Sequence, residues 1–197
     1  MSRTFCASYF SYARINETDH IQLQENLPKL TLVLGGAASG KSKYAETLCY
    51  IGGLLKVYVA TAQVFDDEMS DKIAKHLIQR GPNWITIEAP IDVAGALAQA
   101  PDDAVILIDC ATLWLTNVIL GDHDLVAATE ALLAGIAQCP HPIVIVSNEV
   151  GYGIVPENVL SRRFRNAQGA LNQTLATHAD RVVAVMAGLP LTLKGDQ

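Results

Sequence analysis

Several classes of protein are excluded by what this sequence of 197 residues lacks. It has no excess of basic residues, because its formal net charge at pH 7 is −6, and this excludes broad binding of nucleic acid or anionic membranes. No apolar run approaches the ~20 residues of a membrane span, since Ala104–Ile108 ends at Asp109. The four cysteines, at positions 6, 49, 110 and 139, form no C-x-x-C pair, which predicts reduced thiols in a cytoplasmic protein and no metal bound to them.

A linker rich in proline, glycine or serine is also absent, so we expect a single folded domain. Half of the residues are hydrophobic and only 17% are charged, which is typical of a compact globular protein. Residues 1–26 contain no basic segment followed by an apolar core, and they do not fit a secretory signal. We expect residues 1–28 to be a flexible N-terminal extension and residues 29–197 to form the domain.

What the sequence does contain is a phosphate-binding loop. An apolar strand at Thr31–Leu34 leads into the pattern Gly-x-x-x-x-Gly-Lys-Ser, and Lys43–Cys49 follows as a helix. The residues of the loop are Gly35, Gly36, Ala37, Ala38, Ser39, Gly40, Lys41 and Ser42. Glycines let backbone N–H groups surround a polyphosphate at the positive end of the helix, Lys41 reaches the outer phosphates, and Ser42 can bind Mg²⁺. The strand, loop and helix together favour a nucleotide site over a merely flexible loop.

Strands and helices alternate along the rest of the chain. Strands are predicted at 56–61, 84–88, 104–109, 142–147, 181–186 and 191–193, and helices at 66 or 67–79, 92–100, 111–138 in two pieces, and 160–175. The strand at 104–109 is almost wholly apolar, as expected of a strand covered on both faces. The pattern predicts an α/β fold, P-loop NTPase-like and RecA-like, with a mostly parallel sheet and helices on both faces.

Asp109 ends an apolar strand downstream of the phosphate-binding loop. A carboxylate in this position, together with the Ser42 hydroxyl, would hold a nucleotide-bound Mg²⁺ directly or through water. The alternative is an aspartate that only caps the next helix. The upstream loop favours the metal role.

Lys72, His76 and Arg80 are spaced at i, i+4 and i+8, so they line one edge of the predicted helix that ends at residue 79. Such an edge is commonly just solvated. It can also face phosphate, and a neutral imidazole flanked by cations is a good nucleophile toward phosphorus. The other four histidines, at 20, 123, 141 and 178, have no such neighbours, and we expect them to be structural or exposed.

Arg162, Arg163 and Arg165 cluster near the start of the last long helix, where the helix dipole disfavours cations. A phosphate, a substrate or a subunit contact would explain them, and so would salt bridges to Glu157. Glu88 at a strand end and Glu149 in a glycine-rich loop are candidate polar ligands, although each can equally be a cap or an exposed charge.

With these residues placed, the chain resembles the bifunctional adenosylcobinamide kinase/adenosylcobinamide-phosphate guanylyltransferase family of cobalamin biosynthesis. The motifs that carry the resemblance are Gly35–Ser42, Tyr58–Thr61, Asp67–Met69, Ile73, His76, Arg80, Trp84, Thr86, Glu88, Asp109–Asn117, Asn148–Pro156, Phe164, Arg165, Gly169, Asn172, Gln173 and Ala187–Pro190. They occur in order over about residues 30 to 194, and only the N-terminal segment falls outside them.

The resemblance implies two reactions. ATP or GTP phosphorylates a hydroxyl of adenosylcobinamide, and GTP then donates GMP to that phosphate through a GMP-histidine intermediate. His76 matches the histidine that is guanylylated, and Lys41 is the second catalytic residue. The nucleotide positions that the resemblance adds to the loop are Ala60, Thr61, Ala62, Leu77, Ile78, Gln79, Arg80, Glu88 and Asp109. Mg²⁺ is the implied cofactor, and similar proteins form homotrimers with sites near the subunit interfaces.

Two residues depart from the family pattern: Ala38 stands where arginine is usual, and Asn166 where aspartate is usual. Without the arginine the loop loses a charge-assisted phosphate contact, which bears on nucleotide affinity or on the kinase step. Two other functions remain as alternatives. One is a small-metabolite or nucleotide kinase without a covalent intermediate, and the other is a nucleotide-dependent regulatory protein without transferase chemistry.

Overall fold

The structure is a computed structural model that describes residues 27–50, 54–63, 80–81 and 83–195. The predicted helix at 66–79 and the first 26 residues of the predicted N-terminal extension lie outside these ranges. Leu27, near the end of that predicted extension, packs against a buried apolar cluster of the domain. The boundary between extension and domain stays a prediction.

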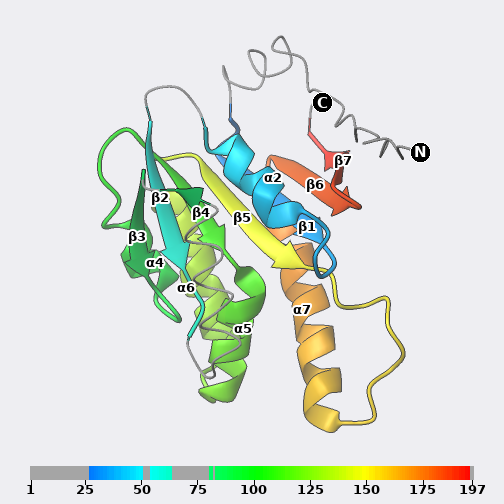
Figure 1. Ribbon diagram of the computed structural model, residues 1–197. Helices are drawn as coiled ribbons and strands as arrows, with labels where there is room; N and C mark the ends of the chain where they lie inside the picture. Colours follow the sequence, from blue (N-terminus) through cyan, green and yellow to red (C-terminus); the bar gives the residue numbers. More distant parts are fainter. Residues whose placement is uncertain (1–26, 51–53, 64–79, 82, 196–197) are drawn as a thin grey trace, which may run out of the picture.

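The described residues form one seven-stranded sheet, as Figure 1 shows. Its strands are β1 (Leu30–Gly35), β2 (Leu55–Ala60), β3 (Trp84–Glu88), β4 (Ala104–Asp109), β5 (Ile143–Asn148), β6 (Arg181–Met186) and β7 (Leu189–Lys194). They lie in the order β3-β2-β4-β5-β1-β6-β7. All neighbouring pairs are parallel except β6 and β7, which form an antiparallel hairpin at one edge. The predicted mostly parallel α/β sheet is therefore confirmed.

The helices that the structure describes begin and end close to the predicted positions. They are α2 (Lys41–Leu48), α4 (Val93–Leu97), α5 (Ala111–Leu120), α6 (Leu125–Gln138) and α7 (Val159–His178). The helical stretch 111–138 is broken after Gly121, as predicted, and α6 restarts at Asp124, whose carboxylate accepts from the backbone N–H of Val126 and Ala127. No described helix is both long and apolar enough to cross a membrane.

Alternation along the strands divides the core into two layers. In β4, Ile106 and Ile108 point into the larger layer, beneath α4, α5, α6 and α7, while Val105 and Leu107 point into the layer beneath α2. Trp114 on α5 is almost fully buried in the larger layer, and its indole N–H donates to the Ile91 carbonyl. Helices therefore cover both faces of the sheet, as the apolar strand sequences require.

The register of the parallel strands aligns their carboxyl ends at one edge of the sheet. Gly35 at the end of β1 is paired with Asn148 of β5. At the end of β4, Asp109 is paired with Ala60 of β2, and Ala60 is paired with Glu88 of β3. Ligand sites of open α/β sheets lie at this edge, and of the predicted nucleotide positions Gly35, Ala60, Glu88 and Asp109 lie along it.

Candidate active site

The phosphate-binding loop joins β1 to α2 and needs unusual backbone angles. Gly40 has φ 93° and Ala38 has φ 53°, both in the left-handed region. The Ser39 N–H donates to the Gly36 carbonyl at 3.3 Å, and the Ser39 carbonyl accepts from the Gly188 N–H at 2.8 Å. A Cβ added at Gly40 would lie 3.2 Å from the Gly188 Cα. The turn between β6 and β7 therefore packs against the phosphate-binding loop and is hydrogen-bonded to it.

The first turn of α2 offers its backbone N–H groups to a ligand. Gly40 precedes the helix and provides no side-chain cap, and the first turn contains no acidic residue. Orphan N–H groups and the helix dipole make such a terminus a site for anions. Lys41 is half-buried and its Nζ donates to the Gly36 carbonyl at 3.0 Å, so in this state the ammonium closes the loop. Ser42, also half-buried, follows it in the same turn.

Asp109 lies within electrostatic reach of the loop. Burial raises the pKa of the neighbouring Cys110 thiol to about 12, with Asp109 raising it further and Lys41 lowering it. Both charges therefore act on one buried group. Asp109 is half-buried, and its carboxylate and the Ser42 hydroxyl are oxygen donors of the kind that Mg²⁺ prefers. Among the described residues, no cluster of three or more His, Cys, Asp or Glu forms a metal cage, so phosphates and water would complete the coordination of such an ion.

Thr61 is fully buried and joins β2 to β4. Its hydroxyl donates to the Cys110 carbonyl at 2.8 Å and accepts from the Cys110 N–H at 2.7 Å. Its own carbonyl accepts from the side chain of Asn117 on α5 at 2.8 Å, and the same Asn117 amide donates to the Pro90 carbonyl at 3.0 Å. The Thr61 side chain thus has no surface for a ligand, and we expect it to position Ala60 and Ala62 rather than to contact a nucleotide.

Arg80 is the last residue of the predicted basic edge, and the structure buries it. Its guanidinium carbon lies 3.2 Å from the centroid of the Tyr58 ring, which is a cation–π contact. Burial raises the pKa of the Tyr58 hydroxyl; the negative charges of Asp109 and Glu46 raise it further, and Arg80 lowers it. Arg80 is therefore not solvated, because its side chain packs on the Tyr58 ring of β2. Its role in binding a nucleotide stays a prediction.

Glu46 on α2 is a buried charge that the sequence analysis did not single out. It raises the pKa of Tyr58 and also that of Cys49, whose pKa is raised mainly by burial. The signal was present in the sequence, since Glu46 stands one turn before the buried Cys49 on α2 and beside the buried Ala45. Glu46, Tyr58, Arg80 and Asp109 form a group of polar residues on the α2 side of the sheet edge.

The remaining predicted nucleotide positions are distributed as follows. Ala60 and Ala62 are half-buried at the end of β2, and Glu88 is exposed at the end of β3. His76, Leu77, Ile78, Gln79 and Lys72 lie outside the described residues. The structure thus gathers the loop, Ala60, Glu88 and Asp109 at one sheet edge and leaves the role of the histidine a prediction.

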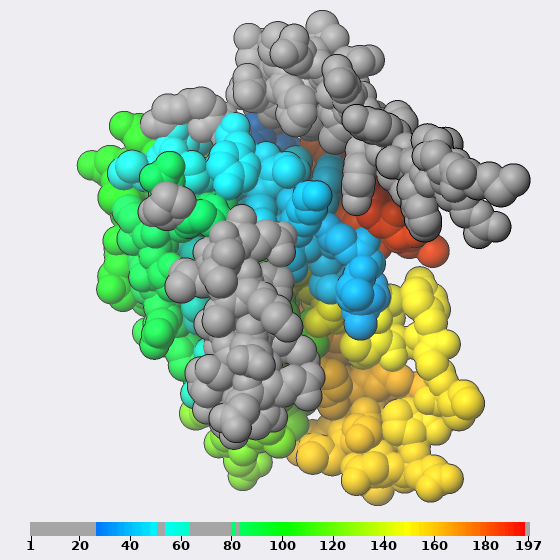
Figure 2. Space-filling view, viewed as in Figure 1, coloured from blue at the N-terminus to red at the C-terminus, as the bar shows by residue number. Residues whose placement is uncertain are grey.

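The glycine-rich segment after β5 starts beside the phosphate-binding loop. The Glu149 N–H donates to the Gly35 carbonyl at 3.0 Å, and its carboxylate accepts from the Gly151 N–H at 2.6 Å. Figure 2 shows the yellow segment directly below the blue loop residues. Glu149 therefore acts as a cap within its own turn, which was one of the alternatives for this residue.

The three arginines near the start of α7 are in different surroundings. Arg162 donates to the backbone carbonyls of Pro156 and Glu157, so its contact with Glu157 is to the main chain. Arg163 is exposed, and Arg165 is half-buried. Arg162 thus fixes the end of the glycine-rich segment to α7, and the other two guanidiniums are left to serve other contacts.

A buried polar network that the sequence analysis missed joins α7 to β5. The Gln168 amide donates to the Ser147 hydroxyl and to the Asn172 carbonyl oxygen, both at 2.9 Å. Ser147 donates to Asn172 at 2.6 Å, and Asn172 donates to the Asn148 carbonyl at 3.1 Å. The Asn148 N–H donates to the Thr112 hydroxyl. The network holds the end of β5, and with it the base of the glycine-rich segment.

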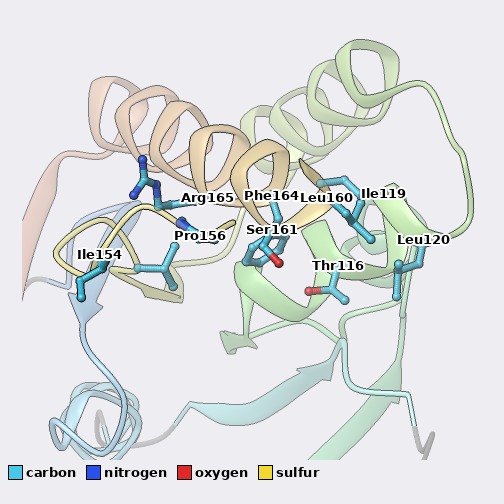
Figure 3. Close-up of a pocket in the computed structure, with 10 residues that line it drawn as sticks. Thr116, Ile119, Leu120, Ile154, Pro156, Leu160, Ser161, Phe164 and Arg165 are labelled. Carbon is cyan, nitrogen blue, oxygen red and sulfur yellow. The ribbon is translucent and has the colours of Figure 1, made fainter. Parts of the chain in front are cut away.

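A pocket of about 410 Å³ opens between α5, α7 and the glycine-rich segment. Its lining residues are Thr116, Ile119, Leu120, Val150, Ile154, Pro156, Leu160, Ser161, Phe164 and Arg165. In Figure 3, residues of α5 lie on one side of the pocket, Ile154 and Pro156 on the other, and the first turns of α7 between them. The lining is mostly apolar, and among the described residues that form it Arg165 is the one that carries a charge.

A phosphate-binding loop at the carboxyl edge of a mostly parallel sheet, with an aspartate at the end of β4, defines a P-loop NTPase of RecA-like fold. Residues 31–193 match the family described as "Cobinamide kinase / cobinamide phosphate guanyltransferase", and this chain belongs to that family.

Curated relatives match over nearly their whole length. The chain is 45% identical over 168 residues to the bifunctional adenosylcobalamin biosynthesis protein CobP of Pseudomonas aeruginosa, covering 84% of this chain and 97% of the relative. It is 42% identical over 183 residues to the bifunctional adenosylcobalamin biosynthesis protein CobU of Salmonella typhimurium, covering 84% of this chain and 99% of the relative. The resemblance inferred from the motifs is confirmed.

Solved structures with low sequence identity share the fold. The flagellar accessory protein FlaH of Methanocaldococcus jannaschii has a TM-score of 0.51 at 14% identity, covering 92% of this chain and 85% of that one. A protein of Pyrococcus horikoshii, PH0250, has a TM-score of 0.55 at 8% identity, covering 93% of this chain and 94% of that one. These likenesses concern the fold alone.

Proposed function

We propose that this chain catalyses both reactions named in the family description, phosphorylation of adenosylcobinamide and transfer of GMP to the product. The observation that carries the proposal is the braced phosphate-binding loop, with Lys41 and Ser42 at a sheet edge that also carries Asp109, in a chain that belongs to this family. A kinase without a covalent intermediate would need the same loop, but it would leave the family's second activity without a basis.

In the first reaction the acceptor hydroxyl oxygen attacks the γ-phosphorus of ATP or GTP. A bond forms between that oxygen and the γ-phosphorus, the bond from the γ-phosphorus to the β,γ-bridging oxygen breaks, and the nucleoside diphosphate leaves. The hydroxyl proton passes to solvent. Lys41 would leave the Gly36 carbonyl to pair with the outer phosphates, and the N–H groups of the first turn of α2 would hold them. Bound at Ser42 and Asp109, Mg²⁺ would supply neutralising charge for the phosphates.

In the second reaction an imidazole nitrogen of His76 attacks the α-phosphorus of GTP, the bond to the α,β-bridging oxygen breaks, and pyrophosphate leaves. A phosphate oxygen of the phosphorylated acceptor then attacks the same phosphorus, and the phosphorus–nitrogen bond breaks to restore the imidazole. The product therefore contains a diphosphate that joins the acceptor to guanosine. In each transfer one bond to the α-phosphorus forms and one breaks. Only the neutral imidazole has the lone pair for the first attack.

We also propose that the protein is a homotrimer. The number of three subunits is what the family resemblance implies, and what supports self-association is β7, an edge strand whose three leucines, Leu189, Leu191 and Leu193, are 55–70% exposed. Alternate residues of a strand share a face, so these side chains form one apolar stripe, and unprotected edges of this kind favour association. Measurement of the mass in solution by light scattering tests this, and a monomer at micromolar concentration would contradict it.

The experiment that tests the two-reaction proposal uses GTP labelled at the α-phosphorus. Wild-type protein is expected to take up a covalent label that acid removes and to form adenosylcobinamide-GDP. His76→Asn should lose both the label and this product while it keeps phosphorylation of adenosylcobinamide, because that step needs no protein adduct. A label that persists in His76→Asn would place the nucleophile elsewhere. Phosphorylation without any label in the wild type would favour the simple kinase.

A further inference from the structure

The described lining of the pocket between α5 and α7 combines exposed apolar side chains with the charge of Arg165. Ile154 is 96% exposed, Leu120 61% and Leu160 47%, and all three belong to the lining. Exposed apolar groups gathered at a concave surface mark a binding site more often than a bare surface does. A volume of about 410 Å³ falls within the range of small-molecule sites.

Two walls of the pocket come from segments that start close to the phosphate-binding edge. Its glycine-rich wall begins at Glu149, whose N–H donates to the last residue of β1, and Val150 follows in the lining. Its other wall belongs to α5, the helix that begins two residues after Asp109, and the first lining residue on that helix is Thr116. A ligand in the pocket therefore lies near the edge at which the triphosphate is expected.

We propose that this pocket is the acceptor subsite, in which one edge of the corrin ring of adenosylcobinamide packs against Ile154, Leu160 and Phe164. The inference rests on the proposed function and adds the location of the second substrate. A corrinoid has broad apolar faces and a polar periphery, which matches an apolar wall with hydroxyls at Thr116 and Ser161. The open mouth allows the rest of a ligand larger than the pocket to extend over the sheet edge.

Arg165 supplies the charge that this acceptor needs after the first reaction. It is half-buried at the edge of the lining, beside Ile154 and Pro156 in the view of Figure 3. A guanidinium there complements the phosphate that the acceptor gains, and an apolar segment of protein would provide nothing to pair with it. Charge complementarity thus favours the phosphorylated corrinoid over a second copy of the chain as the occupant.

Two matched pairs of variants test the subsite. Leu160→Asp and Ile154→Asp place a carboxylate in the lining, where it must be desolvated beside the ring. Val159→Asp and Tyr152→Asp place the same charge at neighbours that are 71% and 93% exposed and outside the lining. Both positions on α7 are in its first turn, where an acidic residue suits the helix dipole, and both loop positions are exposed, so all four variants are expected to fold.

The expected result is a KM for adenosylcobinamide that rises about tenfold or more in the two lining variants and stays within about twofold in the two controls. Covalent labelling by α-labelled GTP should stay within about twofold of wild type in all four, because that half-reaction needs no corrinoid. Arg165→Gln should raise the KM of the phosphorylated acceptor more than that of the unphosphorylated one.

An unchanged acceptor KM in both lining variants, with labelling intact, would overturn the subsite and leave the proposed function standing. Equal effects in lining and control variants would overturn it too, and so would a rise in KM that occurs only in variants whose mass in solution has fallen, since the pocket would then be a contact between copies. A wild type that shows neither labelling nor phosphorylation would contradict the proposed function itself.

Discussion

The two sides of this active site are built in different ways. The phosphate-binding side consists of backbone groups held by hydrogen bonds, such as the buried ones between Thr61 and Cys110 and the one between Gly188 and Ser39. The acceptor side consists of apolar side chains on two helices and a loop, with Leu160 and Ile154 exposed to solvent. Phosphate is recognised by fixed dipoles, and fixing them needs a rigid frame. A large ring is recognised by contact with exposed apolar side chains. Substitution of such exposed side chains costs little free energy of unfolding.

The largest effect is expected from Lys41→Ala, which removes a charged group from the phosphate-binding side. The ammonium is expected to pair with the triphosphate in both reactions, so kinase turnover and guanylylation should each fall by about a hundredfold to a thousandfold. The melting temperature should stay unchanged, because Lys41 makes one exposed hydrogen bond to the loop carbonyl. Lys43→Ala, on the exposed face of the same helix, is the matched control. Both activities within a few-fold of wild type in Lys41→Ala would disprove the loop assignment.

Asn117→Ala tests how much the buried hydrogen bonds on the phosphate-binding side contribute to the free energy of unfolding. The substitution leaves the Thr61 and Pro90 carbonyls without their donor, so the free energy of unfolding should fall by about 2–3 kcal/mol in a urea titration. Thr177→Ala, on the exposed face of α7, should stay within about 0.5 kcal/mol. Equal losses in the two variants would remove the contrast between the sides, as would a comparable loss in Ile154→Asp.

Ala38→Arg tests the departure from the family pattern within the phosphate side. Ala38 is exposed and already has a left-handed φ, so a longer side chain adds no new backbone strain and extends into the space before the loop. A guanidinium there should lower the KM of the triphosphate about fivefold through a charge-assisted contact. Ala38→Gln keeps the backbone and adds a polar but shorter side chain without the charge, and should leave that KM unchanged. Parallel changes in the two variants would show that charge is not the cause.

The smallest effect is expected in the pH dependence of the free energy of unfolding, through the buried Cys110 thiol. The folded pKa of Cys110 is raised from 9.0 to about 12 by burial, so the neutral thiol is favoured in the folded state. Its contribution is fully present below pH 9.0 and is lost as the pH rises toward about 12. Between pH 8 and pH 9.5 the wild type should therefore lose about 1 kcal/mol more than Cys110→Ala in chemical denaturation. If the free energy of unfolding changes with pH by the same amount in the two proteins, the Cys110 thiol is not buried away from water.

Much of the phosphate side was predictable because its signals are local. The loop pattern, the apolar strands and the carboxylate at Asp109 each occupy a few consecutive residues, and parallel strands bring their ends to one edge. The inward turn of Thr61 and the stacking of Arg80 on Tyr58 were not predictable, because each depends on a partner from another strand or helix. A spacing of four residues indicates which side chains share one face of a helix, but it does not indicate which residues of the rest of the protein pack against that face.

The acceptor side had a signal in the sequence but no indication of how its parts meet. Several lining residues, such as Ile154 and Phe164, belong to the motifs of the family resemblance, and Leu160 opens the helix predicted at 160–175, yet only the structure places Leu160 at the rim of a pocket. A stripe that lines a pocket and a stripe that fills a core have the same period, and only the packing of α5 against α7 distinguishes them. The Gln168 network escaped notice for a related reason, since a buried amide in a helix looks like a surface residue until its partners are known.

The close approach of Gly40 and Gly188 restricts how this protein can be recombined. The two residues are far apart in the chain, yet a Cβ on Gly40 would lie only 3.2 Å from the Gly188 Cα, and the Gly188 N–H is bonded to the loop carbonyl of Ser39. A chimera that takes its first half from one homologue and its C-terminal hairpin from another must inherit a matching pair at these two positions. In shuffled libraries with a crossover between them, function should therefore be retained only where one parent supplies glycine at position 40 and the other supplies glycine at position 188.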